Sequence, residues 1–299
     1  MAAPTLTEAL VRLHGAGRSD TYGAALLDVA QDHLLWLLAE LGCFDDGSLV
    51  FKGGTSLRKC RLGSVGRFST DLDFVAPSDD TVLAVCEAID GASVSGFEFS
   101  LKETRGDGRH WTLLVRHAQL GQPDIAASVE FARRPLVMAP ERLGFVEVSI
   151  HRAYDLALPT LPVISEAEAC AEKLARYRRV RLGRDVYDLA QFAERWIDEA
   201  QVRRLWVLKV WGDVVDDGRG SKPLDPGDVL TARAEADFAP ESIGKLTRPV
   251  DIPTWERRVR HRFAFLAALD ADEQRWANCD PRHRSEIERV LAAGGFADP

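Results

Sequence analysis

The spacing of apolar positions changes near residue 160 and separates two groups of predicted elements. In the first group, short apolar runs between turn residues predict strands over 48–52, 71–76, 94–103, 111–116, 125–131 and 145–150. Helical spacing predicts two helices among these strands, over 24–41 and from Ser78 to about Asp90. In the second group, helices are predicted over 165–181, 184–194, 199–210, 254–269 and 282–292. Pro159 and Pro162 bracket the break between the groups. We therefore expect an α+β domain over residues 1–160 and a helical domain over residues 161–299.

The predicted strand over residues 71–76 carries two carboxylates on one face. Side chains alternate across a strand, so Asp71 and Asp73 point the same way and lie about 7 Å apart along the backbone. Two hard oxygen ligands on a rigid support suit Mg²⁺, which usually takes one or two protein carboxylates together with phosphate oxygens of a substrate. This strand is therefore a candidate metal site.

A glycine-rich turn precedes this strand. Gly53, Gly54, Thr55 and Ser56 lie between a predicted strand and the start of a short helix. Glycines let a backbone approach a ligand closely, and the N–H groups that open a helix favour phosphate. A phosphate-binding turn ahead of a metal-binding pair suits nucleotidyl transfer, because metal ions neutralise the triphosphate and align it for displacement.

Each of these two features also fits a purely structural role. Most glycine pairs in turns serve only the turn, and a D-x-D sequence often lies on a solvated strand face. A D-x-D sequence also holds the metal in nucleotide-sugar glycosyltransferases. Here it follows the glycine turn closely, and no long nucleotide-binding α/β segment precedes it. This order favours the nucleotidyl-transfer hypothesis.

The sign of the charge is reversed locally in an acidic chain. The sequence holds 38 Lys and Arg against 46 Asp and Glu, a net charge of −8, which excludes a globally basic nucleic-acid-binding protein. Between residues 171 and 185, however, cations predominate: Lys173, Arg176, Arg178, Arg179, Arg181 and Arg184. Such a cluster is either a solvated helix face with ion pairs between turns or a contact for a triphosphate or an RNA backbone.

Together these features resemble the AbiEii/AbiGii-type nucleotidyltransferase toxins of type IV toxin–antitoxin systems. That family includes the MenT group and is similar to the wider DNA-polymerase-β-like nucleotidyltransferase superfamily, which implies a mixed β-sheet with flanking helices. Its pattern holds a Gly-Gly-Thr-x-Leu turn, an Arg-Phe-Ser-x-Asp-x-Asp-Phe strand, a later carboxylate strand, a helical lysine and an Arg-Asp-x-x-Asp-Leu helix. This chain is similar to that pattern at residues 53–57, 67–74, Lys173 and 184–189.

The resemblance implies a role for each matching residue. Asp71 and Asp73 would bind the metal ions, and Lys173 would contact the triphosphate. Asp185 would be an essential carboxylate that orders either the basic cluster or the incoming nucleotide. The third carboxylate of the superfamily would be Glu130, with Asp124 as the alternative.

The resemblance also implies two sets of binding residues. The nucleotide would be held by Gly53, Gly54, Thr55, Ser56, Arg58 and Ser69. The RNA would be held by Arg176, Arg178, Arg179, Arg181 and Arg184. The helical domain would thus contribute Lys173 and Asp185 to the site.

The implied activity is transfer of a nucleotide from an NTP to an RNA acceptor, with the tRNA 3′ end as the best-attested example and Mg²⁺ or Mn²⁺ as the metal. An acceptor hydroxyl, activated by a metal or by Glu130, would attack the α-phosphorus. Pyrophosphate would leave with its charge met by Mg²⁺, Lys173 and Arg58. The toxin would block translation. Its partner would be a cognate antitoxin, in some systems a kinase that modifies a hydroxyl beside the site, for which Ser69 and Thr55 are candidates.

Two other functions stay open at the level of the sequence. The acceptor could be a protein or a small molecule such as an aminoglycoside, which would not need the basic cluster. Alternatively, the chain could be a non-catalytic nucleotide-binding partner protein. The presence of Asp71, Asp73 and Lys173 together argues against the second alternative.

The remaining composition points to a cytoplasmic protein. The five cysteines are widely spaced without a C-x-x-C pair, so neither a disulfide framework nor a zinc site is expected. No run approaches the roughly 18 apolar residues of a membrane span, and no signal peptide is recognisable. Trp196, Trp206 and Trp211 fall on predicted helices, where core positions are expected.

Overall fold

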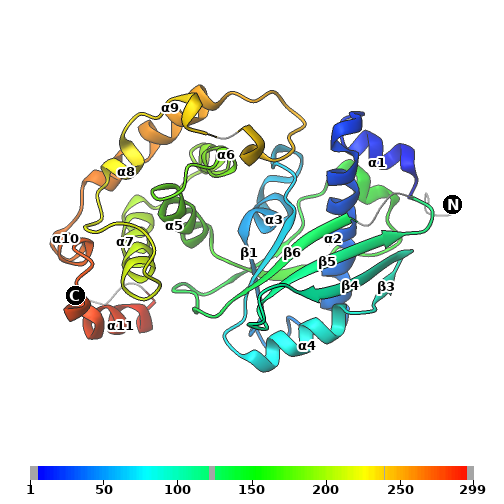
Figure 1. The fold of residues 1–299 in the computed structure, drawn as a ribbon, viewed down its shortest axis with the longest axis horizontal. Coiled ribbons are helices and arrows are strands. Elements are labelled where there is room, and N and C mark those ends of the chain that lie inside the picture. The colour runs from blue at the N-terminus through cyan, green and yellow to red at the C-terminus, as the bar shows by residue number, and fades with distance from the viewer. Residues whose placement is uncertain (1–5, 121–124, 239, 295–299) are drawn as a thin grey trace. The chain divides into compact units, whose positions relative to one another are not determined.

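The computed structural model describes residues 6–120, 125–238 and 240–294 (Figure 1). It divides into two compact units. Unit 1 comprises Met1–Pro135, Pro140–Ile164 and Lys245–Pro249. Unit 2 comprises Leu136–Ala139, Ser165–Gly244 and Val250–Pro299.

Unit 1 is built on a mixed sheet whose strand order, over the described residues, is β3-β4-β5-β6-β2-β1-β8-β7. The strands are β1 Val50–Lys52, β2 Asp71–Val75, β3 Ser93–Val94, β4 Phe97–Glu103, β5 His110–His117, β6 Ile125–Ala132, β7 Glu141–Gly144 and β8 Thr160–Val163. β2 runs antiparallel to β1 and parallel to β6, and β8 runs parallel to β1. The other neighbours pair antiparallel. This architecture confirms the predicted α+β class.

One face of the sheet is apolar and packs against helices. The helices of unit 1 are α1 Glu8–His14, α2 Tyr22–Glu40, α3 Gly53–Leu57 and α4 Asp79–Ile89. α2 contacts β6 and α4, and α4 contacts β4 (Figure 1). Alternation along β2 and β6 buries Leu72, Phe74, Val129 and Phe131 on this face. The polar members of the same strands therefore lie on the opposite face.

The prediction for residues 145–150 was wrong. Residues 145–148 form no ladder, and a 3₁₀ turn, Ser149–Ala153, begins inside the predicted strand. The apolar alternation imitates a strand, but the N–H of Val146 donates to the carbonyl of Lys59 and so takes no part in the sheet. The strands of this region lie on either side of it, as β7 and β8. Pro162 is tolerated inside β8 because the contact with β1 uses Val163 and the N–H of Ile164.

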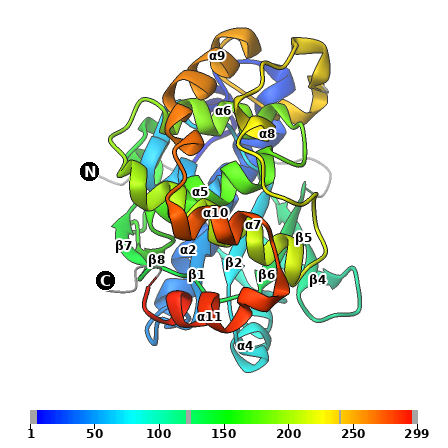
Figure 2. The ribbon, with the colours of Figure 1, turned by 90° about the vertical axis from the view of Figure 1, so that its left-hand side faces the viewer.

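The described part of unit 2 consists of helices joined by loops. Its helices are α5 Glu166–Tyr177, α6 Gly183–Phe192, α7 Glu199–Val215, α8 Gly227–Leu230, α9 Ile252–Arg262, α10 Ala271–Ala277 and α11 Arg284–Ala292. α5 packs against α6 and α7, α9 packs against α6, and α10 lies beside α7 (Figure 2). Ser165 caps α5 as its sequence pattern predicts, because its hydroxyl accepts the N–H of Glu168 at 3.3 Å.

The three tryptophans that were expected in the core differ in burial. Trp206 and Trp211 lie in the core on α7. Trp196 lies between α6 and α7 and is 83% exposed, so its predicted core position was wrong. No helix in the part of the chain that the structure describes is both long and apolar enough to cross a membrane.

Candidate active site

β2 carries the two candidate metal ligands on the polar face of the sheet. Asp71 and Asp73 are half-buried, whereas Leu72 and Phe74 between and beyond them are buried in the core. The strand is short but is held on both sides, by β1 and by β6. The backbone of β2 therefore fixes the Cα positions of both aspartates. The alternation expected from the sequence is confirmed.

Glu130 lies on the same face, one strand away. The parallel register of β2 and β6 pairs Asp73 with Glu130 and Asp71 with Ser128. Paired positions on neighbouring strands are about 5 Å apart, so the Glu130 side chain starts directly beside that of Asp73. Glu130 is half-buried, like the two aspartates. The alternative third carboxylate, Asp124, lies outside the described residues.

The donor set of this face suits a magnesium ion that is shared with a substrate. Among the described residues, no three side chains of His, Cys, Asp or Glu converge closely enough to hold a metal unaided. Mg²⁺ does not require such a cage, because it keeps several waters and takes one or two carboxylates together with substrate phosphates. Asp71 and Asp73 on one rigid strand fit that requirement.

The glycine turn touches this carboxylate pair. Gly53 follows β1 directly, opens α3 and has a φ of +79°, in the left-handed region that favours glycine. A Cβ atom at Gly53 would overlap the carboxylate of Asp73, and one at Gly54 would overlap the guanidinium of Arg67. A side chain at either position would therefore displace the neighbouring charged group. The turn and the metal-candidate strand form one compact group within unit 1.

The hydroxyl groups around the turn hold the backbone in place. Thr55 is fully buried and donates to the carbonyl of Asp71, and Ser56 donates to the carbonyl of Gly53 at 3.0 Å. Ser69 is buried, and its carbonyl accepts the side-chain amide of Gln31 at 3.1 Å. The hydroxyls of Thr55 and Ser56 thus stabilise the turn and β2. Contact of Thr55, Ser56 and Ser69 with nucleotide phosphates stays a prediction.

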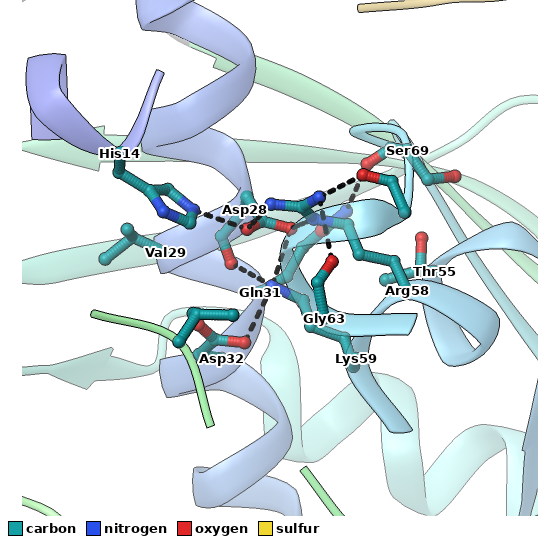
Figure 3. A network of polar contacts seen from close by, with 12 residues as sticks. His14, Asp28, Val29, Gln31, Asp32, Thr55, Arg58, Lys59, Gly63 and Ser69 are labelled. Carbon is teal, nitrogen blue, oxygen red and sulfur yellow. Dashed lines mark hydrogen bonds and ion pairs between the residues drawn. The ribbon is translucent and has the colours of Figure 1, made fainter. Parts of the chain in front are cut away.

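Arg58 points into the core of unit 1. Its guanidinium binds both carboxylate oxygens of Asp28, at 2.8 and 3.0 Å, and donates to the carbonyls of Gly63 and Gly66 (Figure 3). The side chain is 4% exposed. Arg58 thus ties α2 to the loop ahead of β2. Its expected contact with pyrophosphate stays a prediction.

Lys59 extends the same buried network. Its ammonium group lies 2.7 Å from carboxylate oxygens of both Asp28 and Asp32 (Figure 3). Tyr154 donates to Asp32 at 2.7 Å. Burial by itself would raise the pKa of Asp28, but the charges of Arg58 and Lys59 outweigh it and hold that pKa well below its ordinary value. Burial would likewise raise the pKa of Asp32, and Lys59 lowers it. Sequence reasoning missed this network.

A separate charged cluster lies in unit 2, between α5 and α6. Lys173 on α5 lies 2.7 Å from Asp188 and 3.3 Å from Asp185, both on α6. Arg176, one turn after Lys173, lies 3.2 Å from the other oxygen of Asp185. Asp185 is fully buried and binds two cations at once. Of the two roles left open for it, ordering the basic cluster is the one that these contacts support.

The arginines after Lys173 differ widely in exposure. Arg178 is 1% exposed and bound to Asp228 at 2.8 Å, and Arg179 lies 3.1 Å from Asp213. Arg181 is 59% exposed, with Asp237 at 3.4 Å, and Arg184 is half-buried. The buried side chain of Arg178 supports the fold of unit 2 and is not part of an open basic surface. Arg181 retains the exposure that RNA binding requires.

The comparisons with known proteins agree with the geometry of unit 1. Residues 36–284 match the family model described as "Nucleotidyl transferase AbiEii toxin, Type IV TA system". The structure of MenT4, a nucleotidyltransferase toxin from Mycobacterium tuberculosis H37Rv, is similar to this chain with 69% identity and a TM-score of 0.93. The match covers 96% of this chain and 99% of MenT4.

More distant matches are two Helicobacter pylori structures. One is a putative nucleotidyltransferase with 15% identity and a TM-score of 0.48, covering 85% of this chain and 99% of that chain. The other is JHP933, with 14% identity and a TM-score of 0.45, covering 90% of this chain and 97% of that chain. None of the curated proteins compared with the chain matches it. From the family model, which spans most of the sequence, and the 69% identity to MenT4, the chain belongs to the AbiEii nucleotidyltransferase toxin family of type IV toxin–antitoxin systems.

Proposed function

We propose that this nucleotidyltransferase transfers a nucleoside monophosphate from an NTP to the 3′ end of an RNA, that the acceptor is tRNA, and that the modification blocks translation in the cytoplasm. The observation that carries the chemistry is the position of Asp71, Asp73 and Glu130 on one polar sheet face, directly beside the glycine turn. The RNA acceptor is supported by the family resemblance and by the exposed cation Arg181.

The reaction needs charge neutralisation and alignment more than covalent chemistry. Asp71 and Asp73 would hold Mg²⁺ or Mn²⁺, which when bound neutralises phosphate charge and favours the deprotonated acceptor hydroxyl. Glu130 is positioned to accept the proton of that hydroxyl. The hydroxyl oxygen bonds to the α-phosphorus while the bond from the α-phosphorus to the bridging oxygen breaks, and pyrophosphate leaves with the electron pair. The lack of a side chain at Gly53 lets the glycine turn lie directly against the Asp73 carboxylate, so a phosphate bound at the turn would lie close to the metal ligands.

Lys173 is proposed to act on the triphosphate, as the family pattern implies. Its ammonium group is oriented by Asp185 and Asp188, which bind it at 3.3 and 2.7 Å. We expect Lys173→Met to abolish transfer. We expect Arg176→Met to reduce transfer less, because it leaves the contact between Lys173 and Asp188 in place.

Label transfer tests the proposal directly. The purified protein is incubated with Mg²⁺, each α-labelled NTP in turn, and total tRNA, beside Asp71→Asn. Asp80→Asn is the matched control, since Asp80 is exposed on the first turn of α4. Label on tRNA from wild type and Asp80→Asn, but not from Asp71→Asn, would support the proposal. Label on protein or on a small molecule would contradict the RNA acceptor, and no transfer with any NTP and tRNA would contradict the reaction.

A charge reversal separates an RNA acceptor from a small one. Arg181 is the suitable position, because reversing the buried Arg178 would place an unpaired carboxylate next to Asp228 and disrupt the fold. We expect Arg181→Glu to raise the KM for tRNA several-fold and to leave the KM for the NTP unchanged. Arg152→Glu serves as the control, since Arg152 is 80% exposed in unit 1. An equal effect of both changes would argue against a local RNA contact.

The family implies a cognate antitoxin as a protein partner. If that antitoxin modifies a hydroxyl beside the carboxylates, the burial of Thr55 and Ser69 requires the turn to open first. Mass spectrometry of the toxin after coexpression with its antitoxin would detect the modification. An unmodified toxin that is nonetheless inhibited would indicate inhibition by binding.

A further inference from the structure

The polar face of the sheet continues beyond the three carboxylates across β6, β5 and β4. The register places Ser128 beside Asp71, Thr112 beside Ser128, and Lys102 beside Thr112. With strands about 4.8 Å apart, this row extends about 14 Å from Asp71 to Lys102. Ser128 and Thr112 are half-buried, and Lys102 is exposed. A polar row of this length leads from a candidate metal ligand to a cation.

A second row runs beside the first and also ends at a cation. Glu130 lies beside Asp73, and His110 on β5 lies beside Glu130. Asp107 lies 2.6 Å from Nδ1 of His110, and Arg105 donates to Nε2 at 3.2 Å. Because arginine can only donate, Nε2 accepts and the proton of the ring lies on Nδ1, toward Asp107. This chain of contacts fixes the exposed guanidinium of Arg105 at the β4–β5 turn.

The two faces of these strands differ in burial. Val129, Leu113 and Phe99 alternate with the residues of the two polar rows and are buried in the core. The polar rows lie on the opposite face, which also carries the half-buried Leu114, and packing of the core does not account for them. Serine, threonine and cationic side chains in this arrangement are suited to a sugar-phosphate backbone, which offers acceptor oxygens and negative charge.

The geometry of an in-line displacement indicates which substrate lies on this polar face. The glycine turn follows β1, which lies on the opposite side of β2 from β6. If the triphosphate lies at the turn, pyrophosphate leaves on the β1 side. In an in-line displacement the attacking hydroxyl approaches from the side opposite the leaving group, which is the side of β6. The chain that carries the hydroxyl then extends over β5 and β4.

We propose, building on the proposed function, that this polar face binds the sugar-phosphate backbone of the RNA acceptor next to its 3′ end. The residues of this acceptor surface are Ser128, Thr112, Lys102 and Arg105. The hydroxyls donate to phosphate or ribose oxygens, Lys102 supplies a point charge, and Arg105 supplies a planar fork for phosphate. Contacts of this kind position the acceptor without reading its bases.

Binding of a probe RNA tests the acceptor surface without relying on turnover. The probe is a fluorescently labelled RNA hairpin with a single-stranded 3′ end, titrated with the full-length chain. We expect Lys102→Ala/Arg105→Ala to raise the Kd about tenfold or more near 0.1 M salt, and to lower the slope of log K against log salt by about 1 to 2. The Kd for an NTP with Mg²⁺ and the urea unfolding curve are expected to stay unchanged.

The matched control removes two other exposed cations of unit 1, in Arg142→Ala/Arg152→Ala. An equal loss of RNA binding in both double variants would overturn the inference, because the effect would then reflect net charge alone. Unchanged RNA binding in Lys102→Ala/Arg105→Ala would overturn it as well. As a second test, Thr112→Val is expected to raise the KM for RNA several-fold with kcat and the KM for the NTP unchanged.

Failure of this inference can be told apart from failure of the proposed function. Wild-type transfer to tRNA together with a wild-type KM for RNA in Lys102→Ala/Arg105→Ala would refute only the acceptor surface. Absence of wild-type transfer to any RNA, with label on another acceptor, would refute the RNA reaction and the acceptor surface together.

Discussion

Unit 1 contains two pairs of aspartates whose environments are opposite. Asp28 and Asp32 lie one turn apart on α2 and are buried, with cations from the segment after the glycine turn bound to both. Asp71 and Asp73 lie two residues apart on β2 and are half-buried on the polar face of the sheet. The residue type is the same in both pairs, but the spacing of each pair matches the period of its own secondary structure.

The difference shows what each pair can do. A buried carboxylate is stable only with close cations, and such cations leave it no free capacity for a ligand. Asp28 therefore serves to attach α2 to the chain between the glycine turn and β2. A carboxylate that keeps an accessible side can take a metal ion together with a substrate. We expect substitutions in the first pair to change stability and substitutions in the second to change activity.

The largest expected effect is on catalysis and comes from the half-buried pair, Asp71 and Asp73. Asp71→Asn keeps the size of the side chain but removes a metal-binding charge, so label transfer should fall by about 10³-fold or more, corresponding to several kcal/mol of transition-state stabilisation. The midpoint of urea unfolding should not change. A variant that unfolds more easily than wild type would show that Asp71 also supports the fold, which would weaken the comparison.

The second effect is on stability and comes from the buried pair. Asp28→Asn leaves Arg58 and Lys59 with one fewer negative partner in the core, which should lower the free energy of unfolding by about 3–5 kcal/mol. Urea unfolding measures this loss. Glu40→Gln is the control on the same helix, because Glu40 is exposed and its substitution should stay within about 0.5 kcal/mol. Equal stabilities of the two variants would contradict the structural role of Asp28.

A third prediction concerns the contact between the glycine turn and Asp73. Gly53→Ala adds a Cβ that overlaps the Asp73 carboxylate at a positive φ. Displacing that carboxylate should lower kcat/KM for label transfer by about 10²-fold, and the strained backbone should cost about 1–2 kcal/mol of stability. Gly23→Ala is the control, since Gly23 lies in α2 with no heavy atom within 4 Å of the added Cβ. Similar activities of the two variants would show that Asp73 tolerates displacement.

The positions of Asp71 and Asp73 could be predicted from the sequence. The buried pair, Asp28 and Asp32, shows why the partners of other charged residues could not. Strand alternation is local, so Asp71 and Asp73 were placed on one face without tertiary information. The direction of Arg58 depends on Asp28, which is 30 residues away on another element. The signal that was available is two acidic residues one turn apart inside an otherwise apolar helix, which must find buried cationic partners.

The same limit applies to the basic cluster and to β7 and β8. Arg178 and Arg181 are equivalent in the sequence pattern. In the structure Arg178 is buried in an ion pair with Asp228, whereas Arg181 is exposed. Periodicity cannot distinguish them, because the partner lies 50 residues further along the chain. Likewise, residues 145–150 have the alternation of a strand and no neighbouring strand to pair with, whereas β8 gains its pairing from β1 despite Pro162.

The smallest effect expected is a dependence of stability on acidity, and it comes from the buried pair, Asp28 and Asp32. The pKa of Asp28 in the folded chain is well below 3.8, and that of Asp32 is lowered as well. A carboxyl with a depressed folded pKa contributes stability that is complete above its unfolded pKa and is lost as the pH falls through the folded value. Urea unfolding from about pH 6 to about pH 3 should therefore show the advantage of wild type over Asp28→Asn beginning to decline below about pH 4. If that advantage stayed constant between about pH 4 and about pH 3, the stabilisation by Asp28 would have to come from its shape and hydrogen bonds, because its charge would not account for the difference.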